Sequence, residues 1–158
     1  MSRAFVKELD GEAGEDLPEL VVSPHRNLVT PTGLAQIERT LHRLDSELTD
    51  ARAAGDKPLV ARIERDLRYF RQRKATAELA QPTGSTDKVR FGSRVELETR
   101  AGERVEFSIV GEDESDPSRG LISYVSPLAE SLMGGSVGDL VPFMDTEAEI
   151  VGVESGPG

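Results

Sequence analysis

Apolar residues between positions 28 and 81 recur at alternating spacings of three and four, the pattern of a coiled-coil helix. The first stripe follows Thr30-Pro31, where a hydroxyl N-cap precedes a proline at the first helical position. Its members are Leu34, Ile37, Leu41, Leu44, Leu48 and Ala51. The members of the second stripe are Val60, Ile63, Leu67, Phe70, Lys74 and Ala77. Only a short turn around Gly55 separates the stripes, so we expect an antiparallel helical hairpin over residues 28–82.

After a short linker at residues 83–87, the pattern changes to the alternation typical of β-strands. The stretch VRFGSRVELETR alternates in this way and suggests a β-bulge at Gly92. Further strands are predicted for RVEFSIVGEDE, LISYV, VGDLVPF and EAEIVGVE. The run SPLAESLMG predicts one short helix with Ser126 as its N-cap. Residues 88–154 should therefore form a small α+β domain with an antiparallel sheet of four or five strands.

Residues 1–27 show little periodicity and carry six acidic side chains against three basic ones. We expect an extended acidic arm without stable structure of its own. The arm lacks the apolar core of a signal peptide, and the chain has no apolar run of the roughly 20 residues that a membrane span needs. These observations predict a cytoplasmic protein that does not contact membranes.

Charge is distributed unevenly along a chain whose net charge is -10. Residues 82–158 carry fifteen acidic and six basic side chains, which argues against general nucleic-acid binding because phosphate contacts need lysine and arginine. Residues 28–81 are the exception, with ten basic and eight acidic side chains. The chain has no cysteine, and His25 and His42 are too far apart in sequence to suggest a zinc site. We therefore expect a protein partner and no cofactor of the chain's own.

The turn of the hairpin contains Asp56, the one candidate for a catalytic carboxylate. A second interpretation is that Asp56 caps the following helix, because aspartate before Lys57-Pro58 is what capping alone would select. Capping is the favoured interpretation, and we predict no metal site.

Four arginines of the second helix recur every three residues: Arg62, Arg65, Arg68 and Arg71. Neighbouring members of this row share a helix face. One interpretation is a surface that contacts RNA or an acidic protein. The other is a solvated helix with ion pairs such as that between Asp66 and Arg62.

The stretch GLISYVSPLAESLMGGSVGDLV at Gly120–Val141, preceded by IVGEDESDP at Ile109–Pro117, closely resembles the C-terminal domain of the GreA/GreB transcription elongation factors. Val29-Thr30 with Gly33 is similar to the helix start of that family. The resemblance implies an FKBP-like domain that docks on bacterial RNA polymerase and a coiled coil that enters its secondary channel. It also implies that acidic residues at the tip help the polymerase to hold Mg²⁺ while it cleaves its own transcript, so the factor is not itself an enzyme.

The family resemblance also suggests a docking surface made of Ser126, Pro127, Leu128, Met133 and Asp113. The alternative is structural: the residues around Pro127 start and pack the short helix, and Asp113, Glu114 and Asp116 form a solvated loop.

At the tip, the chain departs from the family pattern GD.SENA.Y. Leu59 stands where the family has a glutamate, and the next acid is Glu64, roughly 9 Å down the helix. The hairpin is also shorter than the family's by about ten residues on each strand, or roughly 15 Å of reach. We therefore expect a factor that binds polymerase but stimulates cleavage weakly or not at all.

Two other classes of function fit the sequence less well. A peptidyl-prolyl isomerase or chaperone would need an aromatic-lined pocket, and several of the candidate aromatic residues are needed for the core. A coiled-coil adaptor would be dimeric, whereas the resemblance implies a monomer that contacts polymerase and nascent RNA.

Overall fold

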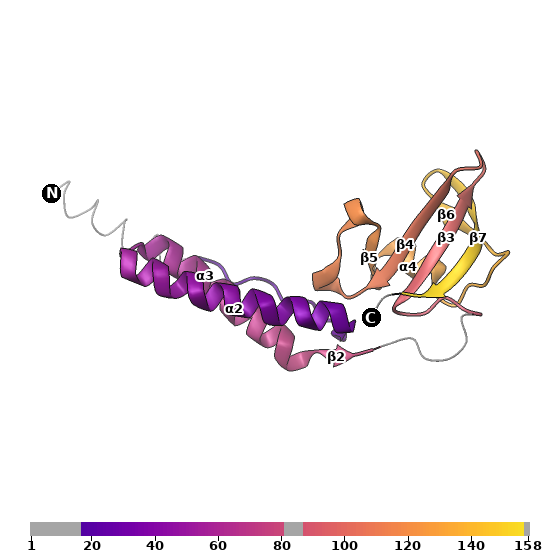
Figure 1. Cartoon of the computed structure of the whole chain (residues 1–158). Helices are drawn as coiled ribbons and strands as arrows, with labels where there is room; N and C mark the ends of the chain where they lie inside the picture. The colour runs from indigo at the N-terminus through magenta and orange to yellow at the C-terminus, as the bar shows by residue number, and fades with distance from the viewer. Residues whose placement is uncertain (1–16, 81–86, 157–158) are drawn as a thin grey trace. The chain divides into compact units, whose positions relative to one another are not determined.

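The computed structural model describes residues 17–80 and 87–156, which fall into two compact units (Figure 1). The first unit contains residues 17–24 and 37–76, and the second contains residues 25–36, 77–80 and 87–156. Most of the predicted arm and of the predicted linker lies outside the described residues. Within the described part of the chain, no helix is long and apolar enough to cross a membrane.

Two helices form the hairpin that the apolar stripes predict: α2 spans Pro31–Ala54 and α3 spans Lys57–Thr76. Five residues are buried between them, namely Leu44, Leu48, Ala51, Ile63 and Leu67. Leu41, Leu59, Val60 and Phe70 pack against this cluster and are partly buried. The predicted hairpin is confirmed, and its core is a narrow, mainly aliphatic seam.

The second stripe departs from the prediction near the end of α3. Lys74 is exposed, and its ammonium group lies 3.8 Å from the carboxylate of Glu38. The buried residue at this end is Arg73, with 1% of its surface exposed. Placing Lys74 in the apolar stripe was wrong because its long side chain can keep the charge in water, whereas burying it would cost free energy.

A short parallel ladder joins the residues before α2 to those after α3. In it β1, Leu28–Val29, pairs with β2, Glu78–Leu79. The Glu78 N–H donates to the Asn27 carbonyl at 2.8 Å, and the Ala80 N–H donates to the Val29 carbonyl at 2.9 Å. The two ends of the hairpin are therefore held together by backbone hydrogen bonds.

Five strands form the sheet of the second unit, in the order β5-β4-β3-β7-β6. Their bounds are Ser93–Thr99 for β3, Arg104–Val110 for β4, Leu121–Ser123 for β5, Leu140–Phe143 for β6 and Thr146–Ser155 for β7. The helix α4, Pro127–Leu132, packs with this sheet on one core. Val95, Leu97, Ile109, Leu132 and Ile150 are completely buried there. The predicted α+β architecture is confirmed, while the likeness to the FKBP fold stays a prediction.

Two details of the sheet differ from the expected pattern. The pair β4–β5 is parallel, because the chain crosses over between them through the short helices η1, Glu112–Glu114, and η2, Pro117–Arg119. Gly120 ends this crossover with a φ of 73°, and a Cβ there would lie 2.7 Å from the Glu106 carbonyl oxygen. The bulge lies in β7, where Val151 is the extra residue opposite Glu96 and Leu97 of β3, whereas Gly92 belongs to the turn before β3.

Candidate functional site

Asp56 caps α3 at the turn of the hairpin. Gly55 ends α2 in the left-handed conformation, with a φ of 69°. The Asp56 carboxylate then accepts a hydrogen bond from the backbone N–H of Leu59 at 3.2 Å. This bond satisfies one of the free donors at the start of the helix, as the capping interpretation predicts.

The neighbouring positions do not supply a second free carboxylate near Asp56. Leu59, three residues on, packs against the apolar seam of the hairpin. Glu64 accepts a hydrogen bond from Arg52 of α2 at 2.9 Å, which balances its charge. Among the described residues, no group of three or more His, Cys, Asp or Glu side chains could hold a metal ion. This arrangement fits helix capping and an interhelical ion pair better than metal binding.

We expect Asp56→Ala to lower the free energy of unfolding by about 1 kcal/mol, because the Leu59 N–H loses its acceptor. The matched control is Asp56→Asn, which keeps an acceptor oxygen and should cost much less. Chemical denaturation followed by far-ultraviolet circular dichroism would measure both. Equal losses in the two variants would contradict the capping role.

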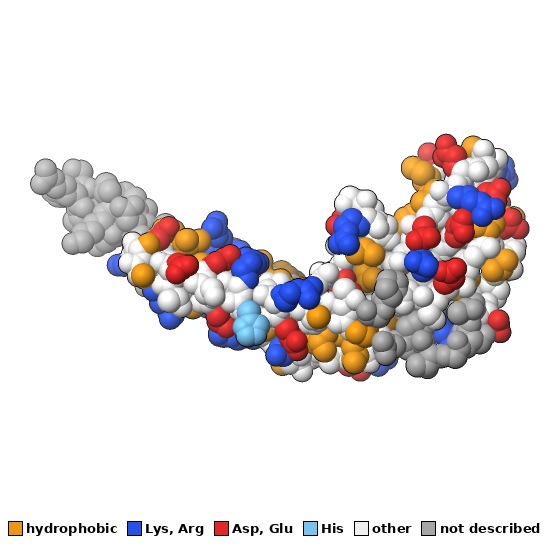
Figure 2. Space-filling view, viewed as in Figure 1, with side chains coloured by type: hydrophobic (Ala, Val, Ile, Leu, Met, Phe, Trp, Pro, Cys, Tyr) orange, Lys and Arg blue, Asp and Glu red, His pale blue; other side chains and the backbone are white. Residues whose placement is uncertain are grey.

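The four predicted basic residues of α3 do not all line the same groove. Arg68 and Arg71 line a groove between the helices, whereas Arg62 and Arg65 do not line it. Asp66, offered as an ion-pair partner for Arg62, pairs with its neighbour Arg65 at 2.9 Å. Figure 2 shows basic and acidic side chains mixed along the visible face of the hairpin. Some of the four arginines therefore form ion pairs, as the solvated-helix interpretation predicts.

The groove between α2 and α3 has a volume of about 460 Å³. Its apolar lining comes from Leu48 and Leu67, which are almost completely buried. Its polar lining consists of Asp45, Thr49, Arg52, Glu64, Arg68 and Arg71. The three arginines and two carboxylates of the lining have a formal charge of +1, before the Glu19 carboxylate beside Arg68 is counted.

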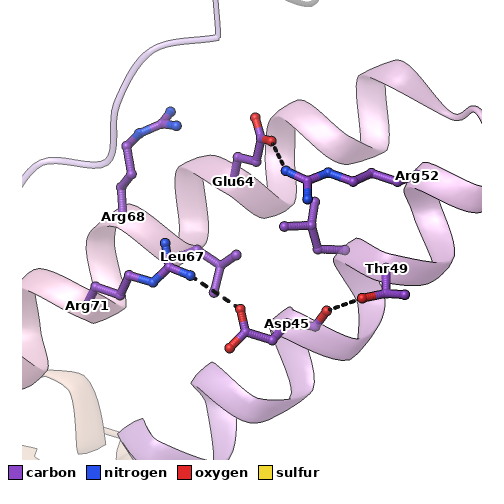
Figure 3. Close-up of a pocket in the computed structure, with 8 residues that line it drawn as sticks. Asp45, Thr49, Arg52, Glu64, Leu67, Arg68 and Arg71 are labelled. Carbon is purple, nitrogen blue, oxygen red and sulfur yellow. Dashed lines mark hydrogen bonds and ion pairs between the residues drawn. The ribbon is translucent and has the colours of Figure 1, made fainter.

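The three groove arginines have carboxylate partners of two kinds (Figure 3). Arg52 reaches Glu64 at 2.9 Å and Arg71 reaches Asp45 at 3.3 Å, so both of these pairs join α2 to α3. Arg68 instead pairs with Glu19 of the segment before the hairpin. The hydrogen bonds from Arg68 lower the pKa of the Glu19 carboxyl below its ordinary value of 4.5.

The predicted docking residues of the second unit cluster around α4. The Ser126 hydroxyl accepts a hydrogen bond from the Ala129 N–H at 3.3 Å, so Ser126 is the N-cap. Leu128 packs against the core of the sheet unit. Pro127 and Met133 are exposed at the two ends of the helix. Ser126 and Leu128 therefore have structural roles, and Pro127 and Met133 are free to contact a partner in the described structure.

Asp113 lies on η1, which is distant from α4 in sequence. The two short helices follow β4 and β5, which are neighbouring strands of the sheet. Val110 at the end of β4 pairs with Ser123 at the end of β5. Since these strands are parallel, the residues that follow them leave the sheet at the same edge. Asp113 and Ser126 each come three residues after these paired positions.

Glu114 has a structural role that the sequence alone does not indicate. Its carboxylate accepts hydrogen bonds from the Thr30 N–H at 3.3 Å, from the Gly111 N–H at 3.0 Å and from the Thr30 hydroxyl. The Thr30 hydroxyl oxygen in turn accepts from the Gly33 N–H at 3.0 Å. Glu114 is thus not a solvated loop acid but completes the N-terminal cap of α2 from a distant part of the chain.

The aromatic residues of the second unit contribute to its core. Phe91 and Tyr124 pack edge to face with ring centroids 5.4 Å apart, and Phe107 lies 5.9 Å from Phe143. The Tyr124 hydroxyl donates to the Arg26 carbonyl. These contacts use the side chains that an aromatic-lined isomerase pocket would need.

Comparisons with known proteins identify relatives of this chain. The family described as "Transcription elongation factor, GreA/GreB, C-term" matches residues 84–155. Transcription elongation factor GreA of Desulfovibrio desulfuricans is 33% identical over 148 residues, covering 79% of this chain and 91% of the relative. GreA of Anaeromyxobacter sp. is 35% identical over 149 residues, covering 79% of this chain and 90% of the relative.

Solved structures of similar proteins were found as well. The crystal structure of GreA factor homolog 1 (Gfh1) of Thermus thermophilus is 26% identical, with a TM-score of 0.40, and the match covers 82% of this chain and 99% of that one. The factor GreA/GreB from Nitrosomonas europaea is 19% identical, with a TM-score of 0.42, covering 80% of this chain and 98% of that one.

Proposed function

Because this chain belongs to the GreA/GreB family of transcription elongation factors, we propose that it binds bacterial RNA polymerase and regulates elongation with little or no stimulation of transcript cleavage. Factors of this family are not enzymes themselves; they stimulate the cleavage that RNA polymerase performs. Binding to polymerase would place the protein in the cytoplasm, where it would act as a monomer.

Docking is assigned to the C-terminal unit, at the docking surface made of Ser126, Pro127, Leu128, Met133 and Asp113. The family match over residues 84–155 supports this assignment, since it covers the whole sheet and α4. Met133 is 40% exposed at the end of α4, which makes it the candidate apolar anchor for a partner. Ser126 and Leu128 would hold this helix in position rather than supply most of the contact.

The hairpin would enter the secondary channel with its turn leading, and its basic residues Arg62, Arg65, Arg68 and Arg71 would face nascent RNA or polymerase. The observation that carries the weak-cleavage proposal is the state of the tip. Asp56 is occupied as a helix cap, Leu59 packs in the hairpin seam, and Glu64 is paired with Arg52. A Mg²⁺ ion brought into the channel needs carboxylates to offset its charge, and this tip offers one.

A cleavage assay on a stalled, backtracked polymerase complex tests the proposal. The positive control is GreA from a cleavage-competent relative. We expect transcript cleavage with this chain to be at least about tenfold slower than with that GreA. This difference corresponds to about 1.4 kcal/mol less stabilisation of the cleavage transition state. Asp56→Ala should leave this low rate unchanged. Robust Mg²⁺-dependent shortening that Asp56→Ala abolishes would overturn the proposal.

Polymerase binding is tested separately in a pull-down with purified RNA polymerase. We expect Met133→Glu to weaken binding at least about tenfold, because a carboxylate would have to be desolvated in the contact. Met144→Glu is the matched control, since Met144 is 88% exposed and lies outside the docking surface. A variant lacking residues 50–62 tests whether the hairpin tip contributes. Equal binding by the two methionine variants would contradict the docking assignment.

A further inference from the structure

An extended segment before the hairpin, residues 17–24, belongs to the same compact unit as most of α2 and all of α3. Figure 1 shows this segment running alongside the two helices. Glu19 within it forms a forked contact with Arg68: the Arg68 Nε lies 3.0 Å from one carboxylate oxygen, and Nη2 lies 2.5 Å from the other. The one acidic residue of this segment therefore pairs with a basic residue that lines the groove between α2 and α3.

The Glu19–Arg68 contact differs from the other two ion pairs of the groove. Asp45 and Glu64 are held in place by the helices that carry them, and their pairs fasten α2 to α3. Glu19 lies on a stretch without helix or strand. In Figure 3, Arg68 points away from the other two pairs. Arg68 is therefore the groove arginine that can exchange its partner without disturbing the hairpin.

The ion pair between Glu19 and Arg68 is exposed to water, so it can be exchanged. The side chains of Arg68 and Glu19 are 54% and 62% exposed. Val21 is 90% exposed and Leu20 is 37% exposed. Ion pairs this accessible to water contribute little to stability and weaken with salt. A segment held in this way stays near the groove because it is tethered, and it yields to a ligand that binds Arg68 more strongly.

We propose that residues 17–24 act as a tethered competitor, in which the Glu19 carboxylate occupies Arg68 until single-stranded RNA displaces it. This inference rests on the proposed RNA-facing role of the basic residues of α3. A guanidinium group binds a phosphate with the same forked geometry that it uses for a carboxylate, so the two anions compete for one site. Displacement would leave Arg68 available to the RNA backbone, while Arg71 of the same groove stays paired with Asp45.

The competition predicts a tighter complex with RNA when Glu19 is neutralised. The probe is a fluorescent single-stranded RNA of about ten nucleotides, and the readout is anisotropy with the full chain at low salt. We expect Glu19→Gln to bind about three- to tenfold more tightly, because the fraction of chains with a free Arg68 rises. Glu103→Gln is the matched control, since it makes the same change in net charge in an exposed turn of the other unit. It should alter affinity less than about twofold.

Two further measurements connect any gain to Arg68. In the double variant Glu19→Gln with Arg68→Gln, the gain in affinity should disappear. Phenylglyoxal, which modifies accessible arginines, should label Arg68 faster in the Glu19→Gln chain, as read by mass spectrometry. Equal RNA affinity of the wild type and Glu19→Gln, an equal gain in Glu103→Gln, or no RNA binding by any variant would each overturn the proposal.

Failure here is distinguishable from failure of the proposed function, because the RNA probe is used without polymerase. A chain that binds polymerase but shows no Glu19 effect would retain the proposed function and lose the competitor. A chain that shows the Glu19 effect but does not bind polymerase would retain the competitor and lose the proposed function.

Discussion

Replacing Leu67 by alanine is expected to unfold most of the hairpin under conditions in which the sheet unit stays folded. Leu67 is 1% exposed and belongs to the cluster of five buried residues between α2 and α3. Truncating a buried leucine to alanine costs about 2–5 kcal/mol, because apolar contacts are lost and a cavity remains. A seam of so few buried residues has little stability left after such a loss.

The two tyrosines of the chain make this prediction easy to follow. Tyr69 lies on α3 and Tyr124 lies in the sheet unit, so their ring resonances report the two units separately. In the Leu67→Ala chain, the Tyr69 signals should lose their native dispersion at a lower temperature than those of Tyr124. Leu140→Ala is the control, because Leu140 is 65% exposed and its truncation should change little. Simultaneous loss of both tyrosine signals would show that the units unfold as one.

Removing the Glu114 carboxylate should have the second largest effect on stability. In Glu114→Ala the N–H groups of Thr30 and Gly111 both lose their acceptor. Gly111 is buried and Thr30 is 4% exposed, so these donors would be poorly placed to find water instead. Leaving a buried donor unsatisfied costs about 1–3 kcal/mol.

Denaturant unfolding of Glu114→Ala, Thr30→Ala and the double variant measures how closely these residues are coupled. If Glu114 acts through the cap of α2, the two losses will not add, because either change breaks the same hydrogen-bonded set. Glu114→Gln keeps an acceptor oxygen and should retain part of the stability. Strictly additive losses would show that Glu114 and Thr30 contribute independently.

The hairpin was predictable because the information for it is local. Spacings of three and four place apolar residues on one helix face, and Thr30-Pro31 and Gly55 mark its limits within a few positions. The same local logic identified Asp56 as a cap, whereas the absence of a glutamate at Leu59 was apparent only from the family resemblance. That logic did not identify Arg73 as a buried residue, because a guanidinium in an apolar stripe is contrary to the pattern that defines the stripe.

Pairings between distant segments were not predictable in the same way. The ladder between Leu28–Val29 and Glu78–Leu79 involves strands of two residues, too short to show alternation. The parallel pair β4–β5 depends on a crossover whose sequence reads as a polar loop. The partners of Arg68 and Glu114 are likewise chosen by the folded structure, at separations of 49 and 84 residues.

Because of the ladder at the base of the hairpin, the length of the hairpin can change independently of the sheet unit. Since backbone bonds between β1 and β2 hold both ends of the hairpin, equal numbers of residues can be removed from α2 and α3 without breaking that closure. Each heptad removed from both helices keeps the apolar register and shortens the reach by about 10 Å. Evolution could in this way adjust how far a factor extends while leaving its sheet unit unchanged. A chimera that replaces residues 37–76 with a longer hairpin of the same register should therefore fold.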